Sequence, residues 1–261
     1  MVFHWQFDPV AFSLGPLSVR WYGLLFVGAF LCGQWLLSRL FKAERRDPAQ
    51  AEGLLLYALV GTLIGARLVH CLFYDPAYYL SQPLAILKVW EGGLASHGGA
   101  LGLLAGLWLG GRRLTPPPHP LWLLDRVAIP AALGGAFVRL ANFLNSEIVG
   151  RPTSGDWGVV FTAVDALPRH PVQLYEAASC LLVFVILLAA WWRWREATPR
   201  GLLFGGFLLL VFSARIVAEA FKQPQAAYEA GWPFTVGQGL SLPFVLAGLV
   251  FVVRAWRQRP R

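Results

Sequence analysis

Charged residues are scarce in this chain of 261 residues. Asp, Glu, Lys and Arg together make up 14% of it, whereas soluble globular proteins average about 25%. Apolar residues make up 57%, so a soluble domain of this size would lack the polar surface to cover its core. The composition argues against a soluble enzyme, a disordered chain and a secreted disulfide scaffold, and it predicts an integral membrane protein.

Cysteine is also rare, and its spacing matches no metal site. Cys32, Cys71 and Cys180 lie in separate apolar runs without a CxxC pair. The sequence also lacks a G-x-S-x-G elbow, an H-E-x-x-H motif, metal-spaced carboxylates and a P-loop. We therefore expect no metal and no cofactor. An enzyme of this kind would take its nucleophile from a substrate and supply positioning and charge stabilisation.

The net charge of +8 raises the question of nucleic-acid binding. A protein of that class gathers its Lys and Arg residues on one water-exposed face. Here the basic residues lie between apolar stretches instead. We therefore expect no nucleic-acid partner and expect membrane lipids to surround the chain.

Seven apolar stretches are long enough to cross a bilayer, which takes about 20 residues. Short segments with turn chemistry separate them, such as the three prolines Pro116–Pro118. The sequence therefore predicts a single all-α transmembrane domain over residues 1–261, with seven helices. The predicted spans are 19–41, 54–74, 94–111, 121–144, 172–192, 201–221 and 235–256.

The distribution of basic residues predicts the orientation. Loops that follow the first, third, fifth and seventh stretches hold 13 of the 22 Lys and Arg residues, and such residues are retained in the cytoplasm. The N-terminus is therefore expected outside and the C-terminus in the cytoplasm. Residues 1–18 then form an outer interfacial arm, and residues 75–93 and 145–171 form outer loops.

Three arginines, Arg67, Arg139 and Arg215, lie within the apolar stretches. A lipid-facing arginine at a helix centre costs about 2.5 to 3.5 kcal/mol, so all three should face the protein interior. In one interpretation each pairs with a carboxylate, with Glu219 four residues after Arg215 and Glu147 eight after Arg139. In the other, an anionic ligand balances the charge, because the planar guanidinium suits phosphate.

Three polar segments lie near the outer ends of the predicted spans. His97 lies in the glycine-rich segment 92–99; a histidine inside a membrane is more often a hydrogen-bonded core residue, but imidazole also suits proton transfer at neutral pH. Arg139, Asn142 and Asn145 follow at i, i+3 and i+6, and the segment 169–176 opens the next span with further polar residues. A helix cap explains one asparagine but not the series.

The chain resembles the bacterial prolipoprotein diacylglyceryl transferases along nearly its whole length. Residues 138–151 are similar to the family signature G-R-x-G-N-F-x-N-x-E-x-x-G-R, with Val138 and Ala141 in place of glycines and Ser146 where glycine is frequent. Near the end of the sixth span, Ala220, Lys222 and Gln225 stand where the family usually has Phe, Arg and Asp. The segments that carry the resemblance are 7–12, 20–24, 65–67, 92–99, 139–151, 170–176, 215–219 and 237–241.

The resemblance implies a reaction and a location. Members of the family move the diacylglyceryl group of phosphatidylglycerol to the lipobox cysteine of a preprolipoprotein, forming a thioether and releasing glycerol phosphate. They are multi-pass proteins of the bacterial inner membrane, so the outer loops would face the periplasm.

The resemblance also implies roles for individual residues. Arg139 and Arg215 would hold the phosphate, and His97 would deprotonate the thiol. The implied substrate-binding residues are Tyr22, Arg67, Asn142, Asn145, Glu147, Gly150 and Glu219.

Two alternatives stay open at this point. A lipid or anion transporter would also line its pathway with arginines, but it needs access from both membrane faces, whereas the polar motifs cluster at the outer ends of the spans. A protein of the same fold could instead bind lipid or lipoprotein signal sequences without turnover.

Overall fold

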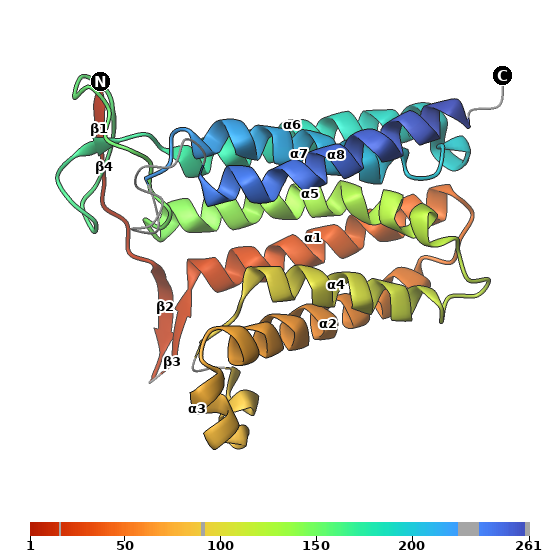
Figure 1. Ribbon diagram of the computed structural model, residues 1–261, viewed down its shortest axis with the longest axis horizontal. Helices are drawn as coiled ribbons and strands as arrows, with labels where there is room; N and C mark the ends of the chain where they lie inside the picture. The colour runs from red at the N-terminus through yellow and green to blue at the C-terminus, as the bar shows by residue number, and fades with distance from the viewer. Residues whose placement is uncertain (16, 90–91, 224–234, 259–261) are drawn as a thin grey trace. The chain divides into compact units, whose positions relative to one another are not determined.

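The computed structural model describes residues 1–15, 17–89, 92–223 and 235–258, which are mostly helical (Figure 1). The principal helices are α1 (Trp21–Ala43), α2 (Ala49–Phe73), α4 (Ser96–Gly111), α5 (Pro120–Leu144), α6 (Val172–Trp194), α7 (Leu202–Glu219) and α8 (Val236–Arg257). The shorter ones are α3 (Pro76–Ser81) and the 3-10 helices η1 (Pro83–Leu87) and η3 (Arg195–Ala197).

Six helices of the described chain, α1, α2, α5, α6, α7 and α8, are long and apolar enough to cross a membrane. The protein is therefore a mainly helical, multi-pass integral membrane protein. The seventh expected span forms α4, which has 16 residues. At 1.5 Å per residue it is about 24 Å long, somewhat shorter than the roughly 30 Å hydrocarbon layer, so the count of seven stays a prediction.

The chain forms two compact units. The first comprises Met1–Leu36 and Leu124–Arg261, and the second comprises Leu37–Leu123. The single-domain organisation stays a prediction.

The first unit contains five short strands that the all-α prediction did not include. β1 (Val2–Trp5) pairs in parallel with β4 (Gly158–Phe161), and β4 pairs antiparallel with β5 (Pro168–Arg169). β2 (Val10–Leu14) and β3 (Leu17–Arg20) form a separate antiparallel pair. These strands lie in the expected outer arm 1–18 and in the expected outer loop 145–171, except that β3 extends two residues into the predicted first span. They are too short to register in a search for apolar stretches of about 20 residues.

An aromatic cluster joins this small sheet to the end of α5. The ring of Trp5 lies 4.5 Å from that of Phe143, which in turn meets Phe161 edge-on at 5.7 Å. Phe161 is fully buried. Phe143 belongs to the signature segment, so the sheet anchors the turn that carries the polar residues there.

A buried carboxylate positions the start of α7. Both oxygens of Asp125, on α5, accept backbone hydrogen bonds at the start of α7, from the N-cap residue Gly201 at 2.7 Å and from Phe204 at 2.9 Å. A helix leaves its first N–H groups unpaired and carries partial positive charge there. Asp125 therefore stabilises the beginning of the helix that presents Arg215.

In the second unit, α2 and α4 pack through glycines spaced four residues apart (Figure 1). A Cβ atom at Gly102 would clash with the backbone of Gly61 and Gly65, and one at Gly65 would clash with the backbone of Gly98 and Gly102. Backbones approach this closely in membranes only where small residues line both helices. The glycines of α4 therefore fix its contact with α2.

Candidate active site

Helices α5, α6 and α7 bring five charged side chains into one alternating series, here termed the ion-pair chain. Its members are Arg139, Glu176, Lys222, Glu219 and Arg215. Glu176 lies 3.2 Å from Arg139 Nε and 2.9 Å from Lys222 Nζ. Glu219 lies 3.0 Å from Lys222 Nζ and 3.9 Å from Arg215 Nε. Three cations and two carboxylates leave a net formal charge of +1.

The ends of the ion-pair chain are more accessible than its centre. The Lys222 side chain is 6% exposed, whereas those of Arg139 and Arg215 are 20% and 37% exposed. Among described residues, neither arginine donates a hydrogen bond to another protein group. Both line a cavity of about 90 Å³ together with Glu176 and Cys180. Their guanidinium groups are therefore available to an anionic ligand, for which a planar fork is well suited.

Glu147 accepts hydrogen bonds from both asparagines of the series Arg139, Asn142 and Asn145. Asn142 Nδ2 donates to one carboxylate oxygen at 3.0 Å and Asn145 Nδ2 to the other at 3.1 Å. The interpretation in which Glu147 is the partner of Arg139 is wrong, because Arg139 pairs with Glu176. The reason is that α5 ends at Leu144, so a count of helical turns does not extend to residue 147.

The residues after α5 are fastened to the end of α7. Gly150 forms an isolated bridge with Lys222, and Arg151 donates from Nε to the Lys222 carbonyl at 2.8 Å. A Cβ atom at Gly150 would lie 2.7 Å from His170 Cβ and from Val172 Cγ2. Only glycine allows this close approach. Gly150 therefore lies against the ion-pair chain through backbone contacts.

A second ion pair stabilises the loop before α6. Arg169 donates from Nη1 to the Gly150 carbonyl at 2.9 Å and from Nε to Asp165 at 3.1 Å. The hydrogen bond from Arg169 holds the pKa of Asp165 below its ordinary value of 3.8. This loop therefore depends on an ionised carboxylate.

One further predicted residue, Tyr22, and one glycine of the segment 237–241, Gly237, lie next to these groups. Tyr22, in the first turn of α1, is partly buried and lies within electrostatic range of Glu147 and Arg139. At the start of α8, a Cβ atom at Gly237 would overlap the Glu219 carboxylate. Glycine at position 237 therefore leaves the room that Glu219 needs.

Arg67 and His97 lie in the second unit. The Arg67 side chain is buried and donates to the carbonyl oxygens of Ala85 at 2.6 Å, Ile86 at 2.9 Å and Gly93 at 3.2 Å, and to that of Gly92. The expectation that each arginine in a span pairs with a carboxylate therefore does not hold for Arg67, which fastens the loop between α3 and α4.

His97 is the second residue of α4 and is exposed. Its place in one site with Arg139 and Arg215 stays a prediction, as does substrate binding by Arg67.

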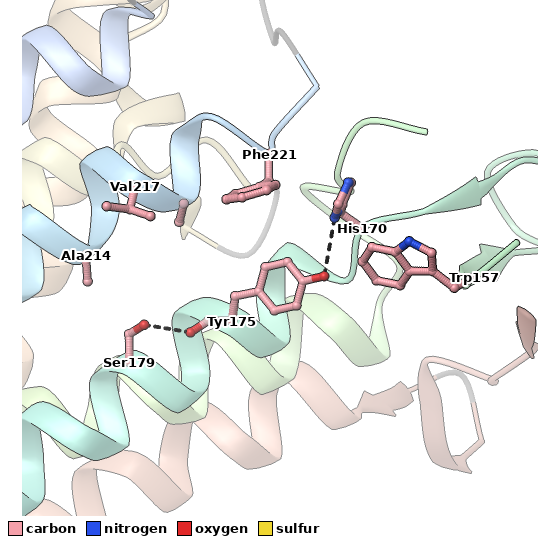
Figure 2. Close-up of a pocket in the computed structure, with 8 residues that line it drawn as sticks. Trp157, His170, Tyr175, Ser179, Ala214, Val217 and Phe221 are labelled. Carbon is pink, nitrogen blue, oxygen red and sulfur yellow. Dashed lines mark hydrogen bonds between the residues drawn. The ribbon is translucent and has the colours of Figure 1, made fainter. Parts of the chain in front are cut away.

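A groove of about 470 Å³ runs between α6 and α7 (Figure 2). Trp157, His170, Tyr175 and Phe221 line one end, and His170 Nδ1 lies 3.3 Å from the Tyr175 hydroxyl. Ser179 of α6 and small aliphatic side chains of α7 line the rest. Ser179 and Ala214 line both this groove and the arginine cavity. An apolar surface therefore adjoins the cationic one.

Comparison with known proteins identifies the family of the chain. A family model described as prolipoprotein diacylglyceryl transferase matches residues 9–254. The chain belongs to this family.

Several relatives share the length of the chain as well as its sequence, and each is named phosphatidylglycerol–prolipoprotein diacylglyceryl transferase. One from Tolumonas auensis is 54% identical, and the match covers 98% of this chain and 99% of the relative. One from Chloroherpeton thalassium is 47% identical over 97% and 94%, and one from Porphyromonas gingivalis is 43% identical over 96% and 94%.

Two departures from the family pattern have a structural explanation here. Ser146 has a φ of +55°, a left-handed conformation that glycine adopts without strain, and this explains why glycine is frequent there. Lys222 keeps the positive charge of the usual arginine and lies in the ion-pair chain. Another departure, Gln225, lies outside the described residues.

Sequence reasoning missed the roles of Glu176 and Lys222. Glu176 ends the polar segment 169–176, and Lys222 was visible as a departure from the family pattern, so both carried a signal. Neither signal identified a partner, because Glu176 and Lys222 pair with each other across two segments far apart in the sequence. Glu176 lies on α6, and Lys222 lies after α7.

Proposed function

We propose that this chain transfers the diacylglyceryl group of phosphatidylglycerol to the lipobox cysteine of a preprolipoprotein. The observation that carries the proposal is the pair of arginines, Arg139 and Arg215, at the exposed ends of the ion-pair chain around one small cavity. Relatives that match nearly the full length of this chain carry the name of this transferase.

The reaction is a displacement at carbon. The substrate thiol, with an ordinary pKa of about 8.5, loses its proton, and the thiolate sulfur attacks the glycerol carbon of the lipid. A carbon–sulfur bond forms while the carbon–oxygen bond to the phosphate breaks, and glycerol phosphate leaves. Negative charge grows on the departing phosphate, so two guanidinium groups held there in advance lower the barrier.

The remaining predicted site residues are assigned to proton transfer or to substrate binding. We assign thiol deprotonation to His97, with the proton passing to its imidazole. We assign substrate binding to Tyr22, Asn142, Asn145, Glu147, Gly150 and Glu219. Arg67, in the second unit, is assigned to substrate binding as well. Both asparagines donate a hydrogen bond to Glu147, and these contacts support fixed side-chain positions for a polar binding surface. The groove beside the arginine cavity is suited to an apolar chain of the lipid.

The chain is proposed to lie in the bacterial inner membrane with seven spans, α4 included. The N-terminus would then be periplasmic and the C-terminus cytoplasmic, as the basic residues between the spans favour.

The test is a transfer assay with purified protein. Proteoliposomes that contain phosphatidylglycerol are incubated with a lipobox peptide, and mass spectrometry detects the added diacylglyceryl group. A peptide with serine in place of the cysteine and vesicles with phosphatidylcholine alone are the controls. Binding of lipid or peptide without a thioether product would overturn the proposal in favour of a non-catalytic protein, and movement of lipid across the vesicle without product would favour a transporter.

A further inference from the structure

Lys222 lies at the centre of the ion-pair chain and contacts both of its carboxylates. Its Nζ is 2.9 Å from Glu176 Oε1 and 3.0 Å from Glu219 Oε1. An ammonium group as buried as this one is stable only when charged partners surround it. The two glutamates meet that requirement, so the side chain has little freedom to turn elsewhere.

The backbone of Lys222 is held as firmly as its side chain. Its carbonyl oxygen accepts from Arg151 Nε at 2.8 Å, and the neighbouring Phe221 carbonyl accepts from the Arg151 amide at 2.8 Å. The bridge with Gly150 adds a further contact. The ammonium group of Lys222 is therefore held in place and can restrain the two glutamate side chains.

Lys222 competes with the arginines for the two carboxylates. Glu176 offers one oxygen to Lys222 and the other to Arg139. Glu219 lies 3.0 Å from Lys222 but 3.9 Å from Arg215, so the lysine holds the closer place. Without Lys222, each glutamate would be free to pair fully with its arginine and neutralise it.

We propose that Lys222 is a positioning residue that restrains Glu176 and Glu219 and so keeps Arg139 and Arg215 open to the phosphate of the lipid donor. This inference rests on the proposed function. A lysine can serve where the family usually has an arginine, because the position requires one cation between two carboxylates.

The experiment compares Lys222→Met with Lys222→Arg in the transfer assay at several mole fractions of phosphatidylglycerol in phosphatidylcholine. We expect Lys222→Met to lower kcat/KM by about 10- to 100-fold, as loss of a supporting contact often does at an active site, with a raised KM for the lipid. Lys222→Arg should stay within about threefold of the wild type, because it restores the cation. Lys42→Met makes the same change at an exposed lysine and should leave the rate unchanged.

A binding measurement separates positioning from general damage. Glycerol 1-phosphate, the released product, should raise the melting temperature of the wild type and of Lys222→Arg, and should not raise that of Lys222→Met. If Lys222→Met does not fold, Lys222→Gln replaces it, since its amide can still donate to one buried carboxylate. Without the positive charge it cannot hold both Glu176 and Glu219, so a loss in the same direction is expected.

Two results would overturn the inference. One is that the uncharged variant, Lys222→Met or Lys222→Gln, shows the wild-type KM and the wild-type response to glycerol 1-phosphate. The other is Lys222→Arg failing as severely as Lys222→Met. Absence of transfer by the wild type would overturn the proposed function instead, while the response to glycerol 1-phosphate would still test Lys222.

Discussion

Arg139 and Lys222 share the carboxylate of Glu176, one at each oxygen, at 3.2 Å and 2.9 Å. The contact joins α5, α6 and the residues after α7 through a single buried side chain. It also explains how three cations coexist near a membrane interior with only two acids between them. The unbalanced charge lies at the accessible arginine ends, where a phosphate would bind.

Arg139→Lys should insert and fold but lose most of its transferase activity. Lysine keeps the charge but not the planar fork that binds two phosphate oxygens. We expect a rate about 10² to 10³ lower, as for loss of one transition-state contact. The measurement is kcat at saturating phosphatidylglycerol together with the melting temperature in detergent. A folded variant with near-normal turnover would mean that the phosphate is held elsewhere.

His97→Gln should retain lipid binding while transfer slows. Raising the pH from 7 toward 9 should recover part of the rate, because more of the substrate thiol ionises by itself. Rates are compared at saturating lipid so that a binding defect does not imitate a chemical one. A wild-type rate for this variant at neutral pH would exclude His97 as the base.

The Asp165–Arg169 pair predicts an acid-sensitive contribution to stability. Because the folded protein lowers the pKa of Asp165, the pair stabilises the fold above the ordinary pKa of aspartate, and the contribution falls as the pH drops below about 4. The carboxylate is partly exposed, so we expect at most about 1 kcal/mol. Asp165→Asn should melt below the wild type at pH 7, and the difference should shrink at pH 3. A difference that does not change with pH would contradict this account.

Ser146→Gly should stabilise the protein. The left-handed backbone at this position strains any residue with a Cβ, so glycine should raise the free energy of unfolding by about 0.5 to 1 kcal/mol. Ser38→Gly, in the interior of α1, is the control and should lower it. Thermal melting in detergent measures both variants, and a lower melting temperature for Ser146→Gly would contradict the strain argument.

Reporter fusions test the proposed orientation. Fusions after Leu114 and after Thr198, which follow α4 and α6, should both report a cytoplasmic location. A periplasmic signal from either would break the seven-span arrangement.

The long apolar helices could be predicted from the sequence, and the polar partnerships could not. The first stretch, predicted at 19–41, forms α1 at Trp21–Ala43. The second, predicted from residue 54, begins at Ala49, because Gln50 and Glu52 are good helix formers that hydropathy does not detect.

The short spacing of Arg215 and Glu219 in the sequence predicted their contact, which is 3.9 Å long. The partner of Arg139 could not be predicted in this way. Glu176 lies 37 positions further along the chain from Arg139, on a different helix. Only the packing of α5 against α6 brings their side chains together, and no periodicity within one helix encodes that.

The parallel pairing of β1 with β4 limits how the polypeptide threads the bilayer. Hydrogen-bonded strands must lie on one side of the membrane, so the chain between them must cross an even number of times. Between β1 and β4 lie α1, α2 and α5, which are three candidate spans, together with the shorter α4. Because the number of crossings between the two strands must be even, the pairing favours a fourth crossing by α4. The bridge between Gly150 and Lys222 encloses two crossings, by α6 and α7, and obeys the same rule. With α8 the total becomes odd, which would leave the two termini on opposite sides.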